Sequence, residues 1–315
     1  MMPLPVVFLM GPTAAGKTGL AVKLCEQFPL DIVSVDSAMV YRGMDVGTAK
    51  PSAETLAQAP HRLIDICDPA EAYSAARFRS DALAEIEAIH ENDRIPILVG
   101  GTGLYFRTLE KGLSELPSAD TSVRKRLEAE ASEKGWEHMH QQLAEIDPAA
   151  AARIHPNDPQ RLQRALEVYA LTGKSMTELY ARETAKPLPY EVIKIILSPT
   201  DRTIIHERVK TRFMQMLKDG FVDEVQGLYA RSDLDSATPS MRMVGYRQIW
   251  RYLEGLLDYE EMVKHTIVAT RQLAKRQLTW LRKEENACWF DGQQLDVQDK
   301  VLKFLGESRN ISTRM

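Results

Sequence analysis

An eight-residue phosphate-binding motif near the N-terminus constrains the fold more than any other feature of the sequence. The pattern G-x-x-x-x-G-K-[ST] is matched without deviation by Gly11, Pro12, Thr13, Ala14, Ala15, Gly16, Lys17 and Thr18. The apolar run Val6 to Met10 before the motif predicts a buried strand, and residues 17–27 predict a helix. Backbone N–H groups of such a loop hold phosphate oxygens, Lys17 adds a point charge, and the Thr18 hydroxyl can bind Mg²⁺. The motif leaves open whether the phosphates belong to a nucleotide or to another diphosphate.

Strand and helix patterns continue to alternate after the motif. Further strands are expected at Ile32 to Val35, Leu63 to Ile66, Ile95 to Val99 and Val192 to Leu197, with an amphipathic helix from about Ser74 to Ile89. This order predicts an α/β fold, a P-loop NTPase-like, mostly parallel sheet flanked by helices. Ligands should therefore bind at the carboxyl ends of the strands.

The middle of the chain shows helix patterns only. Helix-start signals occur at Asp120, Asp147-Pro148 and Asp158-Pro159. We predict an inserted all-helical domain at 113–189 within an α/β core of 1–112 and 190–305, followed by a disordered tail at 306–315. Helices in the second part of the core are expected from Asp201 to near Gly220, and at 239–254 and 258–283.

Composition excludes some classes of protein. No run approaches the roughly 20 apolar residues that span a bilayer, so no membrane partner is expected, and no targeting signal is recognised. The three cysteines are odd in number and widely spaced, which favours a reducing cytoplasm over a disulfide framework or zinc cluster. The net charge of −4 does not favour nucleic acid, but residues 242–283 hold nine Lys/Arg against four Asp/Glu, a local balance of +5.

Polar residues follow two of the expected strands. Asp36 and Ser37 come directly after the second strand, where a carboxylate can take a proton beside the phosphate loop. A capping or turn role for Asp36 is equally compatible with this spacing. Gly100, Gly101, Thr102 and Gly103 deliver backbone and a hydroxyl to the same edge, or form only a tight turn.

Six motifs in this order resemble those of bacterial tRNA dimethylallyltransferases. They are Gly-Pro-Thr-x-x-Gly-Lys-Thr, Ser-Val-Asp-Ser-Ala-Met-Val-Tyr, Asp-Val-Gly-Thr-Ala-Lys-Pro, His-Arg-Leu-Ile-Asp, Gly-Gly-Thr-Gly-Leu-Tyr and Val-Gly-Tyr-Arg-Gln, and they extend over nearly the whole chain. The resemblance implies transfer of a dimethylallyl group from dimethylallyl diphosphate to N6 of the adenosine immediately 3′ of the anticodon, with Mg²⁺ as cofactor. The implied partner is the tRNA anticodon arm, and we expect a monomer.

The resemblance also assigns roles to single residues. It implies that Asp36, Lys17 and Thr102 are catalytic, with Asp36 as the base for the adenine amine, and that Arg212 joins the loop in binding diphosphate. The implied tRNA contacts are Asp36, Ser37, Ala38, Met39, Thr102, Arg124, Gln160, Arg161, Leu162, Gln163, Arg164, Arg242, Met243, Val244, Gly245, Tyr246, Arg247, Lys275, Arg276, Gln277, Leu278, Thr279, Trp280, Leu281 and Arg282.

Plainer interpretations exist for several of these features. A basic helix is most often a solvated face, and Trp280 fits a core position better than a base-stacking platform. His61 and His155 lack metal-ligand spacing and are interpreted as structural or hydrogen-bonding residues. Two alternative functions use the same loop: a P-loop kinase of a nucleoside or small metabolite, and a non-catalytic, nucleotide-dependent RNA-binding regulator.

Overall fold

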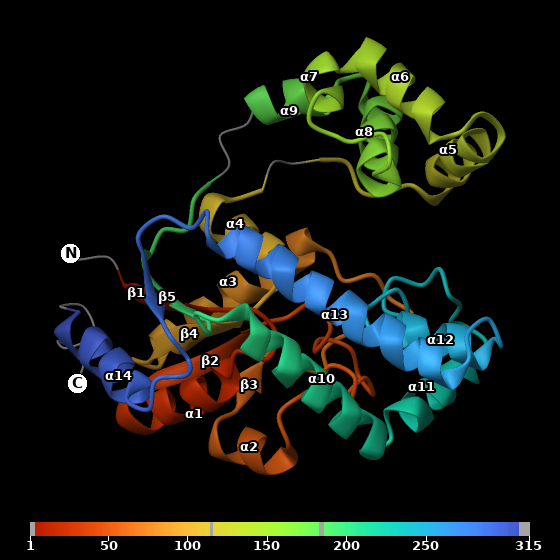
Figure 1. Cartoon of the computed structure of the whole chain (residues 1–315). Coiled ribbons are helices and arrows are strands. Elements are labelled where there is room, and N and C mark those ends of the chain that lie inside the picture. Colours follow the sequence, from red (N-terminus) through yellow and green to blue (C-terminus); the bar gives the residue numbers. More distant parts are fainter. Residues whose placement is uncertain (1–3, 114–115, 183–185, 309–315) are drawn as a thin grey trace. The chain divides into compact units, whose positions relative to one another are not determined.

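A single parallel sheet organises most of the chain in the computed structural model, which describes residues 4–113, 116–182 and 186–308. Within these residues the sheet has the strand order β3-β2-β4-β1-β5-β6, and every neighbouring pair is parallel. The predicted sheet is confirmed (Figure 1). Its strands are β1 (Pro5–Met10), β2 (Leu30–Val35), β3 (His61–Arg62), β4 (Ile95–Gly100), β5 (Glu191–Leu197) and β6 (Ala287–Phe290).

Both faces of the sheet are covered, because β1 alternates its apolar side chains between two hydrophobic cores. Val6, Phe8 and Met10 join the first core, which packs against α3 (Ala75–Glu91), α4 (Gly103–Lys111) and the later helices of the core. Val7 and Leu9 join the second core, beneath α1 (Lys17–Gln27) and α14 (Val297–Glu307). All six residues of β1 are buried, as a central strand covered on both faces requires.

The remaining core helices follow β5, except for α2 (Ala53–Gln58). They are α10 (Arg202–Lys218), α11 (Phe221–Tyr229), α12 (Tyr246–Leu253) and α13 (Tyr259–Leu281). Asp201 caps α10, and Asp258 forms a capping box at the start of α13. No helix in the described residues is long and apolar enough to cross a membrane.

Two sequence-based element predictions were wrong. The expected strand at 63–66 is a bend, with β3 ending at Arg62, because Leu63 and Asp65 have φ of 61° and 58°, which an extended strand does not allow. The expected helix at 239–254 begins only at Tyr246, because turns occupy the residues before it and Gly245 has a φ of 95°. β6 was not predicted at all.

The chain divides into two compact units. One comprises Met1–Glu110 and Leu188–Met315, and the other comprises Lys111–Pro187; the predicted boundaries were 112/113 and 189/190. The second unit holds α5 (Thr121–Lys134), α6 (Trp136–Ile146), α7 (Pro148–Ala151), α8 (Pro159–Thr172) and α9 (Met176–Arg182) around its own hydrophobic core. Asp120, Asp147 and Asp158 cap α5, α7 and α8, as their sequence signals predicted.

The predicted disordered tail at 306–315 is wrong at its start. Gly306 and Glu307 form the last part of α14, where the helix is anchored by the buried side chains of Val301 and Leu305. The remaining tail from 309 lies outside the described residues.

Candidate active site

The phosphate loop connects β1 to α1 at the carboxyl edge of the sheet. Gly11 must lack a side chain, because a Cβ there would lie 2.3 Å from the Leu197 carbonyl oxygen of the neighbouring strand. The Lys17 ammonium donates to the carbonyl oxygens of Gly11 and Pro12 at 3.0 and 2.8 Å. Residues 13–19, Thr18 among them, line a cavity of about 380 Å³.

Two further cations line this cavity from α10. The Arg212 guanidinium lies 3.4 Å from the Thr48 carbonyl oxygen, and that of Arg208 lies 3.5 Å from the Ala14 carbonyl oxygen. Burial lowers the pKa of Lys17 to about 8, although the Asp36 charge opposes the shift. Burial likewise lowers the pKa of Arg212, and Asp36 again acts in the opposite direction. The cavity is therefore a desolvated, cationic pocket suited to an anion.

Asp36 follows β2 and lines this cavity. Its Oδ1 accepts hydrogen bonds from the backbone N–H groups of Ala38 and Met39, at 2.9 and 3.4 Å. The turn role that the spacing allowed is thus present, and it fixes the orientation of the carboxylate. In the described residues Oδ2 has no hydrogen-bond partner, so this oxygen can accept a proton or a donor from a bound molecule.

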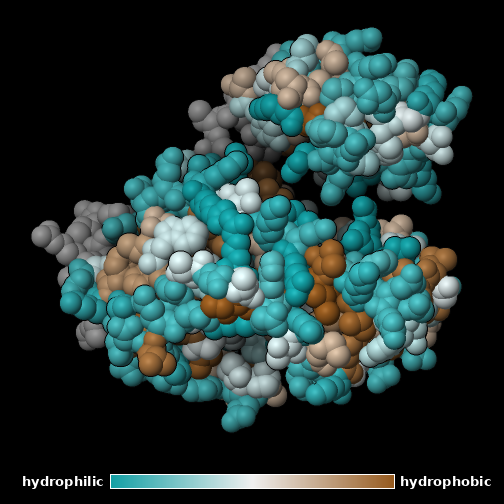
Figure 2. All heavy atoms as spheres, viewed as in Figure 1, coloured by the Kyte–Doolittle hydropathy of each residue, from teal (hydrophilic) through white to brown (hydrophobic). Residues whose placement is uncertain are grey.

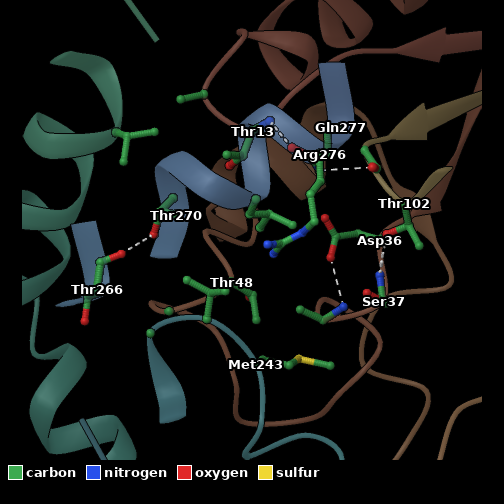
Figure 3. Close-up of a pocket in the computed structure, with 18 of the residues that line it drawn as sticks. Thr13, Asp36, Ser37, Thr48, Thr102, Met243, Thr266, Thr270, Arg276 and Gln277 are labelled. Carbon is green, nitrogen blue, oxygen red and sulfur yellow. Dashed lines mark hydrogen bonds between the residues drawn. The ribbon is translucent and has the colours of Figure 1, made fainter. Parts of the chain in front are cut away.

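A larger cavity of about 630 Å³ adjoins the first one. Seven residues line both cavities: Thr13, Ala14, Asp36, Thr48, Gly101, Arg212 and Gln277. Among the described residues Asp36 is the only carboxylate that lines either space. In Figure 3 the side chains of Asp36 and Arg276 both reach into the larger cavity. Asp36 therefore stands at the junction of a polar, cationic cavity and a larger, mainly apolar one.

The glycine loop after β4 orders the backbone that follows Asp36. The Ser37 backbone N–H donates to the Thr102 Oγ1 at 3.1 Å, and both residues line the larger cavity, as does Ala38 (Figure 3). Thr102 thus retains its hydroxyl proton for donation to another acceptor. Met39 faces the smaller cavity instead, where its sulfur lies 3.9 Å from the Ser34 hydroxyl.

One wall of the larger cavity depends on a carboxylate that the sequence did not reveal. Glu224 on α11 accepts hydrogen bonds from the backbone N–H groups of Asp45, Val46 and Gly47 and from the Tyr246 hydroxyl, at 2.6 to 3.1 Å. A Cβ on Gly47 would lie 2.1 Å from the Phe221 ring. Glu224 thereby holds the turn that brings Thr48 between the two cavities. Only the turn motif itself, Asp-Val-Gly-Thr-Ala-Lys-Pro, was visible in the sequence.

The expected tRNA contacts near α12 and α13 fall into two groups. Arg242, Met243, Val244, Gly245, Arg276, Gln277 and Trp280 line the larger cavity, while Arg247, Lys275, Thr279 and Arg282 are exposed. The side chains of Tyr246, Leu278 and Leu281 are instead buried in the first hydrophobic core. We therefore assign these three side chains to the core, because each is at most 7% exposed. Trp280 belongs to both groups. Its ring stacks on Phe106, with the ring centroids 6.1 Å apart, and it also lines the larger cavity.

In the second unit, the expected contacts surround a buried carboxylate. Arg124 and Arg164 both pair with Glu167, whose side chain is fully buried. Burial would raise the pKa of Glu167, but hydrogen bonds from the two arginines and from the Asp120 N–H lower it. Gln163 bonds to Glu128, and Gln160 is exposed. Arg161 is 74% exposed, whereas Leu162 is buried and belongs to the core.

A cationic groove lies between α10 and α13, apart from these two cavities. It encloses about 350 Å³, and no Asp or Glu is among its lining residues. Its cations are Arg202, Arg271, Lys275 and Arg282, with His206 beside them. In the described part of the chain, none of these four Lys/Arg side chains has an ion pair, and the Arg271 Nε is buried without a hydrogen-bond partner. Figure 2 shows mainly hydrophilic side chains over α13, with hydrophobic ones beside them.

His61 also lines the smaller cavity. Its Nδ1 lies 2.7 Å from the Ala59 carbonyl oxygen, which agrees with the predicted hydrogen-bonding role, and burial lowers the pKa of the imidazole. Among the described residues no group of three or more His, Cys, Asp or Glu side chains is placed to hold a metal ion.

Comparison with known families gives one match that covers most of the chain. The sequence profile of IPP transferases matches residues 39–284, most of the chain. The chain belongs to the IPP transferase family. The matched range begins three residues after Asp36. It contains the turn that Glu224 holds, the inserted unit and the whole of α13. The phosphate loop precedes the matched range.

Three solved structures resemble the whole chain. A tRNA isopentenylpyrophosphate transferase from Bacillus halodurans is 38% identical, with a TM-score of 0.72, and the match covers 98% of this chain and 97% of the other. A tRNA isopentenylpyrophosphate transferase from Staphylococcus epidermidis is 30% identical, with a TM-score of 0.69 and coverage of 96% and 99%. A eukaryotic dimethylallyltransferase acting on tRNA is 26% identical, with a TM-score of 0.81 and coverage of 99% and 80%.

Proposed function

We propose that this prenyltransferase moves a dimethylallyl group from dimethylallyl diphosphate to N6 of the adenosine immediately 3′ of the anticodon in tRNA. Family membership gives the class of reaction. The observation that carries the assignment of roles is the junction of two cavities at Asp36, one cationic and lined by the phosphate loop, the other larger and mainly apolar. We place the diphosphate in the first and the acceptor base with the allylic carbon in the second.

In the proposed reaction, the bond between the allylic carbon and the diphosphate oxygen breaks while the bond between that carbon and the adenine nitrogen forms. The diphosphate leaves with the electron pair, and Lys17, Arg212 and the loop N–H groups stabilise its negative charge. The amine proton passes to Asp36, whose carboxylate is oriented by the turn at residues 36–39. Thr102 accepts a hydrogen bond from the Ser37 backbone N–H, and its own hydroxyl can donate a hydrogen bond to the adenine.

Mg²⁺ fits the smaller cavity in this proposal. Thr18 lines this space beside the phosphate loop, and Mg²⁺ usually takes one or two protein ligands together with substrate phosphates and water. A bound Mg²⁺ would supply positive charge to the leaving diphosphate.

The tRNA must bring its adenine to the larger cavity, which requires the base to leave its stack. Arg242, Arg276 and the exposed cations of α13 support binding of the phosphate backbone near that cavity. In the second unit, Arg161 and its neighbours on α8 are proposed to contact the anticodon arm. We further propose that the enzyme acts as a monomer in the cytoplasm.

The test is a transfer assay with the purified protein, Mg²⁺, an unmodified tRNA and radiolabelled dimethylallyl diphosphate. The label should enter the tRNA, and nuclease digestion should recover it on the adenosine 3′ of the anticodon. ATP in place of the donor should yield no phosphorylated product. Phosphorylation of a nucleoside or small metabolite by ATP, without prenyl transfer, would instead support the kinase alternative. RNA binding without any reaction would support the regulator.

A further inference from the structure

Gln277 joins three parts of the site that are far apart in the sequence. It lies on α13, and its Oε1 accepts a hydrogen bond from the Thr13 backbone N–H at 2.8 Å. Its Nε2 donates to the Gly101 carbonyl oxygen at 3.0 Å. One side-chain amide thus ties the phosphate loop to the glycine loop after β4 and both to α13, as the dashed lines in Figure 3 show.

The space for this amide is built into the neighbouring backbone. A Cβ on Gly101 would lie 2.4 Å from the Gln277 Nε2 and 3.2 Å from the Gly11 carbonyl oxygen, so a side chain at position 101 would displace the amide. One turn further along α13, the Trp280 ring packs against Gly103, where a Cβ would lie 2.4 Å away. The helix is therefore seated on the glycine loop by two consecutive contacts.

The position of Gln277 determines what it can do. Thr13 and Gly101, its two partners, each line both cavities, and so does Gln277. Each end of the amide has one protein partner, which orients it and leaves one N–H and one lone pair of its oxygen for a bound molecule. The adjacent Arg276 lines only the larger cavity, and it has no such internal partners among the described residues.

We propose that Gln277 is a positioning residue through which α13 sets the geometry of the phosphate loop, so that diphosphate binding and tRNA binding are energetically coupled. The coupling part rests on the proposed function, because it takes α13 to be a tRNA-binding element. A shift of α13 on RNA binding moves the amide, and the amide carries the Thr13 N–H and the Gly101 carbonyl with it. This positioning role is distinct from the tRNA contact that family resemblance implied for Gln277.

The first test measures binding of inorganic diphosphate by calorimetry, which needs no prenyl transfer. Gln277→Ala should weaken binding about tenfold, or about 1.4 kcal/mol, because the diphosphate must then order a loop that the amide no longer holds. Gly101→Ala keeps the glutamine but displaces its amide, and it should weaken binding to a similar extent. The double variant should bind diphosphate no more weakly than the weaker-binding of the two single variants. Both changes remove the same hydrogen-bonded position of the Gln277 amide, so their effects should not add. Gln226→Ala, at an exposed position of α11 that lines neither cavity nor the groove between α10 and α13, is the matched control.

The second test repeats these titrations with an anticodon stem-loop RNA present. In the wild type the RNA should change the diphosphate affinity by a measurable factor, and diphosphate should change the RNA affinity by the same factor. That factor should fall toward one in Gln277→Ala, while RNA affinity without diphosphate stays within about twofold of wild type. Thermal melting followed by circular dichroism verifies the fold of each variant.

Three results would overturn the proposal. Unchanged diphosphate affinity with reduced RNA affinity would make Gln277 a tRNA contact. Losses that multiply in the double variant would show that Gly101 and Gln277 act independently. A coupling factor of one in the wild type would remove the link between the two ligands. If Gln277→Ala does not fold, Gly101→Ala decides by the same criteria. Failure of the wild type to transfer a prenyl group would count against the proposed function alone, because these measurements use diphosphate.

Discussion

At the scale of single residues, charge is concentrated where the two cavities meet. Lys17 and Arg212 lie in a desolvated space that disfavours their charged forms, and Asp36 is the carboxylate that offsets this cost. No other Asp or Glu of the described chain lines either cavity. Among the described residues, Asp36 is thus the one Asp or Glu side chain that can accept a proton beside the proposed acceptor amine.

Asp36→Asn should abolish most of the chemistry while preserving the site. Asparagine keeps the size of the side chain and an oxygen for the Ala38 N–H, but it cannot take the amine proton. We expect single-turnover prenyl transfer to fall by about 10² to 10⁴-fold, with donor and tRNA affinities changed much less. A full-rate Asp36→Asn enzyme would show that another residue is the base. A variant that loses only substrate affinity would show that Asp36 serves to hold the turn at residues 36–39.

The lowered pKa of Lys17 predicts a pH dependence of anion binding. Because burial lowers this pKa to about 8, the ammonium is protonated below that pH and becomes neutral above it. Affinity for inorganic diphosphate should therefore fall as pH rises from 7 to 10, approaching tenfold per pH unit above the pKa. Isothermal calorimetry at several pH values across this range measures the fall in affinity.

Lys17→Arg is the control for that measurement, since a guanidinium keeps its proton throughout the range. Its titration reports any contribution from the protonation of diphosphate itself. An identical pH profile in Lys17→Arg and the wild type would show that Lys17 does not titrate in this range.

At the scale of secondary structure, α13 serves two surfaces. One side of the helix carries Gln277 and Trp280 toward the larger cavity, and another carries Arg271, Lys275 and Arg282 into the groove beside α10. Ala274 and Leu278 between these sides are buried. The local positive charge was evident in the sequence, whereas the side that each cation occupies depends on how α13 packs.

Removing the groove cations should weaken tRNA binding through its backbone. In Arg271→Ala/Lys275→Ala/Arg282→Ala, each lost phosphate contact should reduce the slope of log affinity against log salt by about 0.7 to 0.9. Binding of inorganic diphosphate should not change, because none of the three residues lines the smaller cavity. A filter-binding series at several salt concentrations provides both affinity and slope.

A triple variant with the same loss of charge elsewhere is the control. Lys23 on α1 and Lys210 and Lys218 on α10 are exposed, and none of the three lines the groove or either cavity. Their replacement by alanine should leave the slope unchanged. If the two triple variants behave alike, the groove is a solvated face.

The elements that the sequence predicted well are those with strong local signals. The phosphate loop, its flanking strand and helix, and the aspartate caps of α5, α7, α8 and α10 depend on neighbouring residues only. The bend at Leu63 and the turns before Tyr246 were missed because long-range contacts impose them. The Ile66 N–H, for example, donates to the Val40 carbonyl oxygen, and Gly245 packs against Phe221. The roles of Glu224 and Gln277 have the same origin, since each bonds to backbone groups more than 170 positions away.

At the scale of the whole molecule, the helical unit is an insertion that the sheet does not need. Its two connections leave the core at Glu110 and return at Leu188, and the Leu188 N–H donates to the Glu110 carbonyl oxygen at 2.9 Å. Leu188 belongs to the first hydrophobic core, whereas Leu127, Met139 and Leu162 form a separate core in the insertion. Each unit thus buries its own apolar side chains, as an independently folding domain does.

Replacing residues 111–187 by a short glycine and serine linker of about four residues should therefore leave a folded core. The shortened protein should melt cooperatively and bind inorganic diphosphate within about threefold of the full chain, because no residue of the insertion lines the smaller cavity. Its tRNA affinity should fall by at least about tenfold, since the proposed contacts of Arg161 and its neighbours are gone and tenfold corresponds to only 1.4 kcal/mol. Circular dichroism, calorimetry and filter binding measure the three quantities. Loss of diphosphate binding in a folded variant would show that the insertion supports the phosphate loop, and unchanged tRNA affinity would confine tRNA recognition to the core.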